Sequence, residues 1–174
     1  MAYLVVAYPQ LTNDHYVQIQ DFRKAHDQLY FNVIEPHFTI VFPVFDMARH
    51  EFVDEVRARS VGMTGFDFVI RCATVNKDAF NEYYHSFLVP DEGYSRIVKL
   101  HDSLYSEKLS DHLRLDIDFI PHIGIGNSKD PHACKKMTDL WHENEFAIHG
   151  RISMLAIVQY ENNTTITIGE IQLR

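Results

Sequence analysis

Two of the eleven histidines in this 174-residue chain stand in matching local sequences. His37 lies in Pro-His-Phe-Thr-Ile, and His122 lies in Pro-His-Ile-Gly-Ile. Free imidazole titrates with a pKa of about 6.5, so two histidines can supply a neutral base and a protonated acid near neutral pH. We therefore interpret His37 and His122 as a candidate general acid/base pair.

The residues around each histidine alternate as in a strand, where residues i and i+2 share a face. On this pattern His37 and Thr39 point to one side of their strand, and His122 shares a face with Gly124. The residues predicted to point the opposite way, toward helices, are all apolar: Phe38, Ile40, Ile123 and Ile125.

The two histidine motifs recur within a repeated series of elements. The first series is predicted as a strand over 3–8, a helix over 13–28 and a strand over 37–45, then a helix over 47–60 and a strand over 65–75. The second is predicted as strands over 83–89, 118–126 and 146–160 with helices over 93–109 and 130–143, followed by a strand over 164–173. We expect a single domain, 1–174, made of two pseudo-symmetric halves of about 1–78 and 79–174. If their sheets face each other, both histidines point into one central cleft.

These features resemble the 2H phosphoesterase superfamily, which includes 2′-5′ RNA ligase (LigT-like) proteins and cyclic phosphodiesterases. Its mark is a pair of His-x-Thr/Ser-hydrophobic motifs, one in each duplicated half. The first motif here, His37-Phe38-Thr39-Ile40, matches fully. The resemblance implies an α+β fold that is duplicated and bilobal, with two antiparallel sheets around a central cleft and helices on the outside. It also implies metal-independent chemistry on 2′,3′-cyclic or 2′-5′ phosphodiester bonds of a nucleotide or an RNA end.

The resemblance further implies catalytic roles for His37 and His122 and phosphate binding at Thr39 and Gly124. As a hypothesis, His37 protonates the ribose leaving oxygen and His122 activates water. Gly124 stands where the family has Thr or Ser, so it offers no side-chain donor. Either its small size lets backbone N–H groups approach the phosphate, or that oxygen is held poorly and activity is weak or lost.

Composition limits the partners. The chain has 16 basic and 24 acidic residues, a formal net charge of −8, which argues against a broad phosphate-neutralising surface. Among the substrates that the resemblance implies, we therefore expect a small nucleotide or an RNA 3′ or 5′ end rather than a long RNA. Arg71 and Arg151 lie in predicted strands and could face either the site or solvent. No zinc-type Cys/His spacing occurs, so neither a metal nor a cofactor is expected.

The alternative function is a non-catalytic module that binds a nucleotide or RNA end on the same scaffold, weakened by Gly124. The other nine histidines are interpreted as surface or structural residues. Two cysteines without a disulfide pattern, no signal-like N-terminus and no membrane-length apolar run predict a cytoplasmic protein that contacts no membrane. We expect it to be a monomer.

Overall fold

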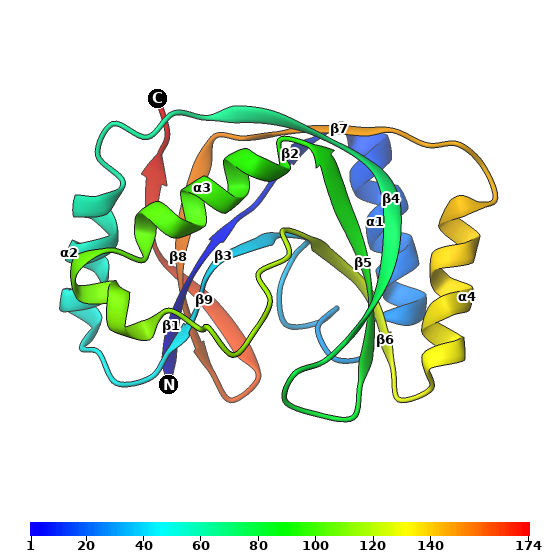
Figure 1. The fold of residues 1–174 in the computed structure, drawn as a ribbon, viewed down its shortest axis with the longest axis horizontal. Helices are drawn as coiled ribbons and strands as arrows, with labels where there is room; N and C mark the ends of the chain where they lie inside the picture. Colours follow the sequence, from blue (N-terminus) through cyan, green and yellow to red (C-terminus); the bar gives the residue numbers. More distant parts are fainter.

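Two antiparallel β-sheets form the centre of the protein, with four α-helices and one 3₁₀ helix around them (Figure 1). A computed structural model describes residues 1–174. The arrangement confirms the expected α+β class with two antiparallel sheets. No helix is long and apolar enough to cross a membrane.

The four-stranded sheet has the order β3-β1-β8-β9. Its strands are β1 (Ala2–Ala7), β3 (Phe38–Val44), β8 (Met154–Glu161) and β9 (Thr164–Gln172). Every residue of β1 is buried, as expected for a central strand rich in β-branched residues. The β8–β9 hairpin turns at Asn162 and Asn163, which both have positive φ, the conformation that tight hairpin turns require.

The five-stranded sheet has the order β2-β7-β4-β5-β6. Its strands are β2 (Gln10–Leu11), β7 (Ile148–Ile152), β4 (Phe66–Lys77), β5 (Tyr84–Glu92) and β6 (Ile123–Ser128). The predicted boundary between halves, near residue 78, lies between β4 and β5, which pair with each other. The division into two pseudo-symmetric halves stays a prediction.

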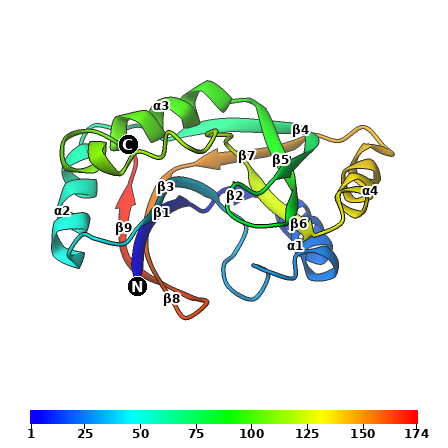
Figure 2. The same cartoon turned by 60° about the horizontal axis from the view of Figure 1, so that its bottom comes forward.

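The helices occupy the two ends of the molecule (Figures 1 and 2). At one end lie α1 (Asn13–His26) and α4 (Pro131–His142), and at the other lie α2 (Arg49–Arg59), α3 (Tyr94–Leu104) and the short helix η1 (Glu107–His112).

Capping residues in the sequence explain where two of these helices begin. The Thr12 hydroxyl accepts from the N–H of His15 at the start of α1, and Asp130 caps α4, which has Pro131 at its first position.

Several predicted boundaries are wrong. Residues 146–160 are two strands, not one: β7 belongs to the five-stranded sheet and β8 to the four-stranded sheet, with Ser153 between them. Alternation of apolar residues identifies extended chain but not its pairing partner, so it does not reveal this crossing. The helix predicted over 93–109 ends at Leu104, because Tyr105 leaves helical geometry and Glu107 has a positive φ.

The ends of two further strands also differ from prediction. β5 continues through Pro90, where the pairing with β4 has a register shift that accommodates a residue without an N–H. The strand predicted over 118–126 begins only at Ile123, and the one predicted over 37–45 begins at Phe38. His37 and His122 therefore each stand directly before a strand rather than inside it.

A core of 28 buried residues holds the two sheets together. It includes residues from both sheets, among them Val5, Ile40, Ile70 and Ile123. The apolar residues that alternate with the histidine motifs belong to it: Phe38, Ile40, Ile123 and Ile125 are each at most 1% exposed. Packing of these four residues into the core leaves the alternate positions free to face away from it.

Candidate functional site

A cavity of about 690 Å³ lies between the two sheets. Its walls include residues of β1, β3, β8 and β9 from one sheet and of β4, β5 and β6 from the other. All four residues predicted for the site line this cavity: His37, Thr39, His122 and Gly124. The fold therefore brings two motifs far apart in sequence to one place.

The two histidines are held in the same way. Nδ1 of His37 lies 2.7 Å from the carbonyl oxygen of Glu35, and Nδ1 of His122 lies 2.6 Å from that of Ile120. A carbonyl oxygen only accepts, so Nδ1 of each neutral ring carries the proton and donates it. Nε2 of each ring has no hydrogen-bond partner in the protein and is free to exchange a proton with a bound molecule.

A proline explains this shared geometry. The accepting carbonyl belongs in each case to the residue before a proline, and the histidine follows that proline: Glu35-Pro36-His37 and Ile120-Pro121-His122. The proline ring fixes its own φ and confines the preceding residue to extended conformations. Both effects restrict the position of the carbonyl, and with it the tautomer and direction of the imidazole.

Burial favours the neutral form of both imidazoles. It is the main reason that the pKa of His37 is lowered from 6.5 to about 4; the hydrogen bond to Glu35 opposes the shift, and the nearby Arg23 charge contributes to it. Burial likewise lowers the pKa of His122 to about 4, with a contribution from the positive charges that His37 and His85 can carry. At neutral pH both rings are therefore neutral until an anion in the cavity favours the imidazolium form.

Gly124 is not required by the backbone or by packing. It does not have a positive φ, and a Cβ placed on it would meet no atom within 4 Å. Gly126 differs, because a Cβ there would lie 2.7 Å from Sδ of Met137 and 3.2 Å from Cβ of His26. The space beside Gly124 is thus open to the cavity, whereas Gly126 permits close packing of α1 and α4 on β6.

Sequence reasoning missed one wall of the cavity. The ring of His122 stacks on Phe87, with centroids 3.5 Å apart, and Phe87 stacks in turn with His85. His85 is only 8% exposed, and its Nε2 lies 2.8 Å from Oδ2 of Asp78. Alternation along β5 puts residues 85 and 87 on one face, but only the pairing of Phe87 with Gly124 on β6 places that face at the site.

The cations considered from sequence are not at the site. Arg71 is paired with Asp91 and Glu92, Arg151 is paired with Asp67, and neither arginine lines the cavity. The basic side chains that do line it, other than histidine, are Arg23 and Lys77. Arg23 is paired with Asp27, whereas Lys77 has no ion-pair partner.

One protein family matches most of the chain. The profile of the 2′-5′ RNA ligase superfamily matches residues 11–164. The chain belongs to this superfamily. It is therefore a 2H phosphoesterase relative, as the paired histidine motifs indicated. Among curated proteins, none matches the chain.

Solved structures of the superfamily have the same fold over nearly the whole chain. TT0787 of Thermus thermophilus is 12% identical, with a TM-score of 0.62, covering 100% of this chain and 98% of that one. Escherichia coli LigT complexed with NADP+ is 11% identical, with a TM-score of 0.60 and coverage of 99% and 96%. Usb1 of Kluyveromyces marxianus is 10% identical, with a TM-score of 0.57 and coverage of 96% and 97%. At these identities the similarity establishes the fold.

Proposed function

We propose that this superfamily member is a metal-independent phosphoesterase for 2′,3′-cyclic or 2′-5′ phosphodiester bonds of a small nucleotide or an RNA end. The observation that carries the proposal is the matched pair of histidines. Two rings, each with Nδ1 held by a pre-proline carbonyl and Nε2 free, border one cavity between the sheets. No group of three or more His, Cys, Asp or Glu side chains is arranged to hold a metal ion.

The reaction then needs only the two rings and water. Nε2 of one neutral histidine takes a proton from water, the water oxygen bonds to phosphorus, and the bond from phosphorus to a ribose oxygen breaks. The other histidine, as imidazolium, gives its Nε2 proton to that leaving oxygen. We assign the acid role to His37 and the base role to His122. Run backwards, the same proton transfers form the bond instead.

Groups beside the histidines would hold the phosphate. The hydroxyl of Thr39 has no partner in the protein and can donate to a non-bridging oxygen. Lys77 supplies an unpaired positive charge at the cavity wall. Gly124 leaves open space where a second hydroxyl would otherwise donate.

Cavity size and charge favour a small or terminal substrate. A volume of about 690 Å³ lies within the range of roughly 300–1,000 Å³ typical of small-molecule sites. The walls also carry the acidic residues Asp78, Asp116 and Asp118, which would repel a long polyanion. Escherichia coli LigT, which shares the fold, has been crystallised with 3′-AMP, ATP and NADP+. These nucleotides support a nucleotide-sized substrate here.

The test is turnover of a substrate panel with and without EDTA. The panel comprises 2′,3′-cyclic mononucleotides, an RNA with a terminal cyclic phosphate, and a 2′-5′-linked dinucleotide. We expect metal-independent turnover of at least one of them. His37→Ala and His122→Ala should each lower kcat by roughly 10²–10⁴-fold.

His50→Ala is the matched control, because His50 is exposed on α2 and does not line the cavity. It should retain wild-type kcat. Full activity in both site variants would refute the proposed pair. Tight binding of these nucleotides without turnover would instead identify a non-catalytic binding module.

A further inference from the structure

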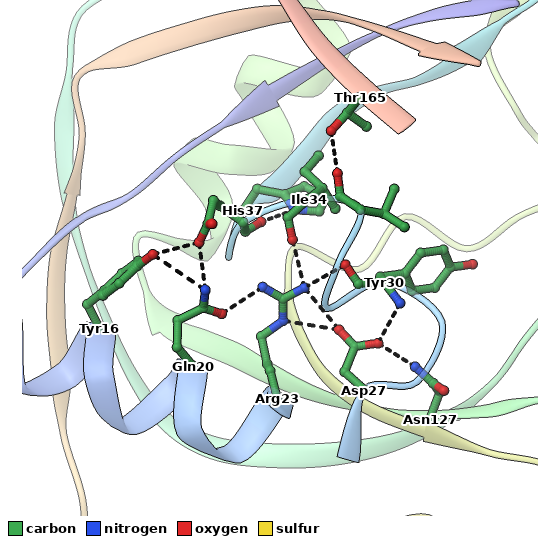
Figure 3. Close-up of polar contacts among 11 residues, drawn as sticks. Tyr16, Gln20, Arg23, Asp27, Tyr30, Ile34, His37, Asn127 and Thr165 are labelled. Carbon is green, nitrogen blue, oxygen red and sulfur yellow. Dashed lines mark hydrogen bonds and ion pairs between the residues drawn. The ribbon is translucent and has the colours of Figure 1, made fainter. Parts of the chain in front are cut away.

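A buried polar network connects α1, the segment 27–37 and β6 (Figure 3). Its centre is the ion pair between Arg23 and Asp27, in which Nη2 of Arg23 lies 3.0 Å from Oδ2 of Asp27. Arg23 is 2% exposed and Asp27 is 5% exposed. A buried ion pair contributes little net stability, because desolvation offsets the attraction between the charges. Its role must therefore be sought in the geometry that it imposes.

The network binds a segment that has no regular secondary structure. Residues 27–37 contain no helix or strand. Nη2 of the Arg23 guanidinium donates to the carbonyl oxygens of Tyr30 and Ile34, at 3.2 and 2.8 Å. Oδ1 of Asp27 accepts from the N–H of Tyr30 at 3.0 Å. The path of the chain toward His37 is thus held by these two side chains together with backbone turn bonds from the N–H groups of Val33 and Ile34 to the carbonyl of Tyr30.

A second branch reaches the side chain of Glu35, the residue before the proline that precedes His37. Nη1 of Arg23 donates to Oε1 of Gln20 at 2.9 Å, and Nε2 of Gln20 donates to Oε2 of Glu35 at 2.7 Å. The hydroxyl of Tyr16 donates to the same carboxylate oxygen at 2.6 Å. Glu35 is the residue whose backbone carbonyl accepts from Nδ1 of His37.

A third branch crosses to the other histidine. Nδ2 of Asn127 donates to Oδ1 of Asp27 at 2.5 Å. Asn127 is 4% exposed and lies on β6, the strand that begins directly after His122. One continuous set of hydrogen bonds therefore runs from the strand of His122 to the carboxylate of Glu35, the residue whose backbone carbonyl holds His37.

We propose that the Arg23–Asp27 pair, linked to Asn127, is a positioning network that sets the direction of His37 relative to His122. The proposal rests on the proposed function, since it assigns these residues to the same reaction. All three residues are at most 5% exposed, and we assign them a role through His37 rather than in contact with the reacting atoms. An arginine suits this task because its planar fork directs several N–H groups in fixed directions, which a lysine ammonium does not.

The test compares Arg23→Met and Arg23→Lys with the matched control Arg59→Met. Arg59 pairs with Glu55 at the same i, i+4 spacing, on α2, which contributes nothing to the cavity. Folding of each variant is checked by thermal unfolding. We expect both Arg23 variants to lower kcat by up to about 10²-fold, the loss that a misplacement of about 1 Å can cause, with little change in KM. The control should retain wild-type kcat.

The ring of His37 provides a readout that does not depend on turnover. Nitrogen NMR of the wild type should show the Nδ1–H tautomer. In Arg23→Met the two tautomers of His37 should both be populated, and the pKa of His37 should rise because the charge of Arg23 is lost while that of Asp27 remains; the tautomer of His122 should be unchanged. If Arg23→Met does not fold, Asn127→Ala removes only the link to β6 and should shift kcat and the His37 tautomer in the same direction.

The outcomes separate the two proposals. Folded Arg23 variants with normal kcat and an unchanged His37 tautomer would show that the network serves stability alone, which overturns the inference. Rescue of kcat by Arg23→Lys would also overturn it, because charge without the fork would then suffice. If the wild type turns over no substrate, the proposed function fails, yet the NMR comparison still decides whether the network positions His37.

Discussion

His37 and His122 have the same hydrogen-bond pattern and similarly lowered pKa values. Each has a proton fixed on Nδ1, an open Nε2 and a pKa of about 4 because of burial. An acid/base pair must differ in protonation, and two pKa values that are both about 4 do not supply that difference. On the proposed function, the phosphate of the substrate would create the difference by favouring the imidazolium form of one ring.

The pH dependence follows from these values. When both pKa values are near 4, the singly protonated pair is most populated near pH 4 in the free enzyme and declines as the pH rises. We expect kcat/KM to fall about tenfold per pH unit between pH 6 and 8. The kcat optimum should lie at higher pH, because the anion in the complex raises the pKa of the acid. A kcat/KM that rises between pH 5 and 7 would contradict this.

Gly124 yields a gain-of-function prediction. Gly124→Ser would put a hydroxyl into open space, without backbone strain or a clash. We expect kcat to rise by about tenfold or more, because an added donor to the developing charge is commonly worth 10²–10³-fold.

Gly126→Ser serves as the control for this substitution. Its Cβ would meet Met137 at 2.7 Å, so it should lower the melting temperature and not raise kcat. A fall in kcat for a stable Gly124→Ser would indicate instead that the substrate approaches the backbone there.

Short elements, rather than long ones, set the direction of the catalytic candidates. The Pro-His pairs stand at the starts of β3 and β6, where the chain enters a sheet. Each strand then places its apolar residues in the core and its remaining residues at the cavity. The proline turn restricts the ring, and the strand after it places the proposed phosphate-binding residue two positions later.

Replacement of these prolines tests the role of the turn. Pro36→Ala and Pro121→Ala free φ and remove the restriction on the preceding residue. We expect each to lower kcat by about tenfold, with a mixture of tautomers at the adjacent histidine in NMR spectra. Pro131→Ala is the control, because Pro131 only begins α4 on the surface. Unchanged tautomers in both variants would show that strand pairing alone orients the rings.

At the scale of the whole molecule, the cavity between the sheets lies in an acidic protein. The formal net charge is −8, and at the cavity Lys77 is the one lysine or arginine without a carboxylate partner. Such a charge distribution can hold one phosphate but cannot follow a nucleic-acid backbone. Salt should therefore affect substrate capture only weakly.

The single unpaired lysine at the cavity predicts how kcat/KM depends on ionic strength. A plot of log kcat/KM against log salt should have a slope of about −0.7, that of a single phosphate contact to a single strand. The slope should approach zero in Lys77→Met. A ten-nucleotide RNA with a terminal cyclic phosphate should have a kcat/KM no higher than that of a cyclic mononucleotide. A slope steeper than about −2 would reveal an RNA-binding surface that the charge pattern does not predict.

The sequence by itself determined the features that depend on local periodicity. Alternation placed His37 with Thr39 and His122 with Gly124, and the capping residues marked the starts of α1 and α4. Two similar motifs also sufficed to indicate the superfamily.

Only the tertiary structure decided what depends on contacts between distant segments. It split residues 146–160 between two sheets, brought Phe87 and His85 beside His122, and joined Arg23 to Asn127 through Asp27. Periodicity reports the conformation of a segment and which of its faces is buried. The partner that covers that face is chosen by packing of the whole chain, so it leaves no local pattern in the sequence.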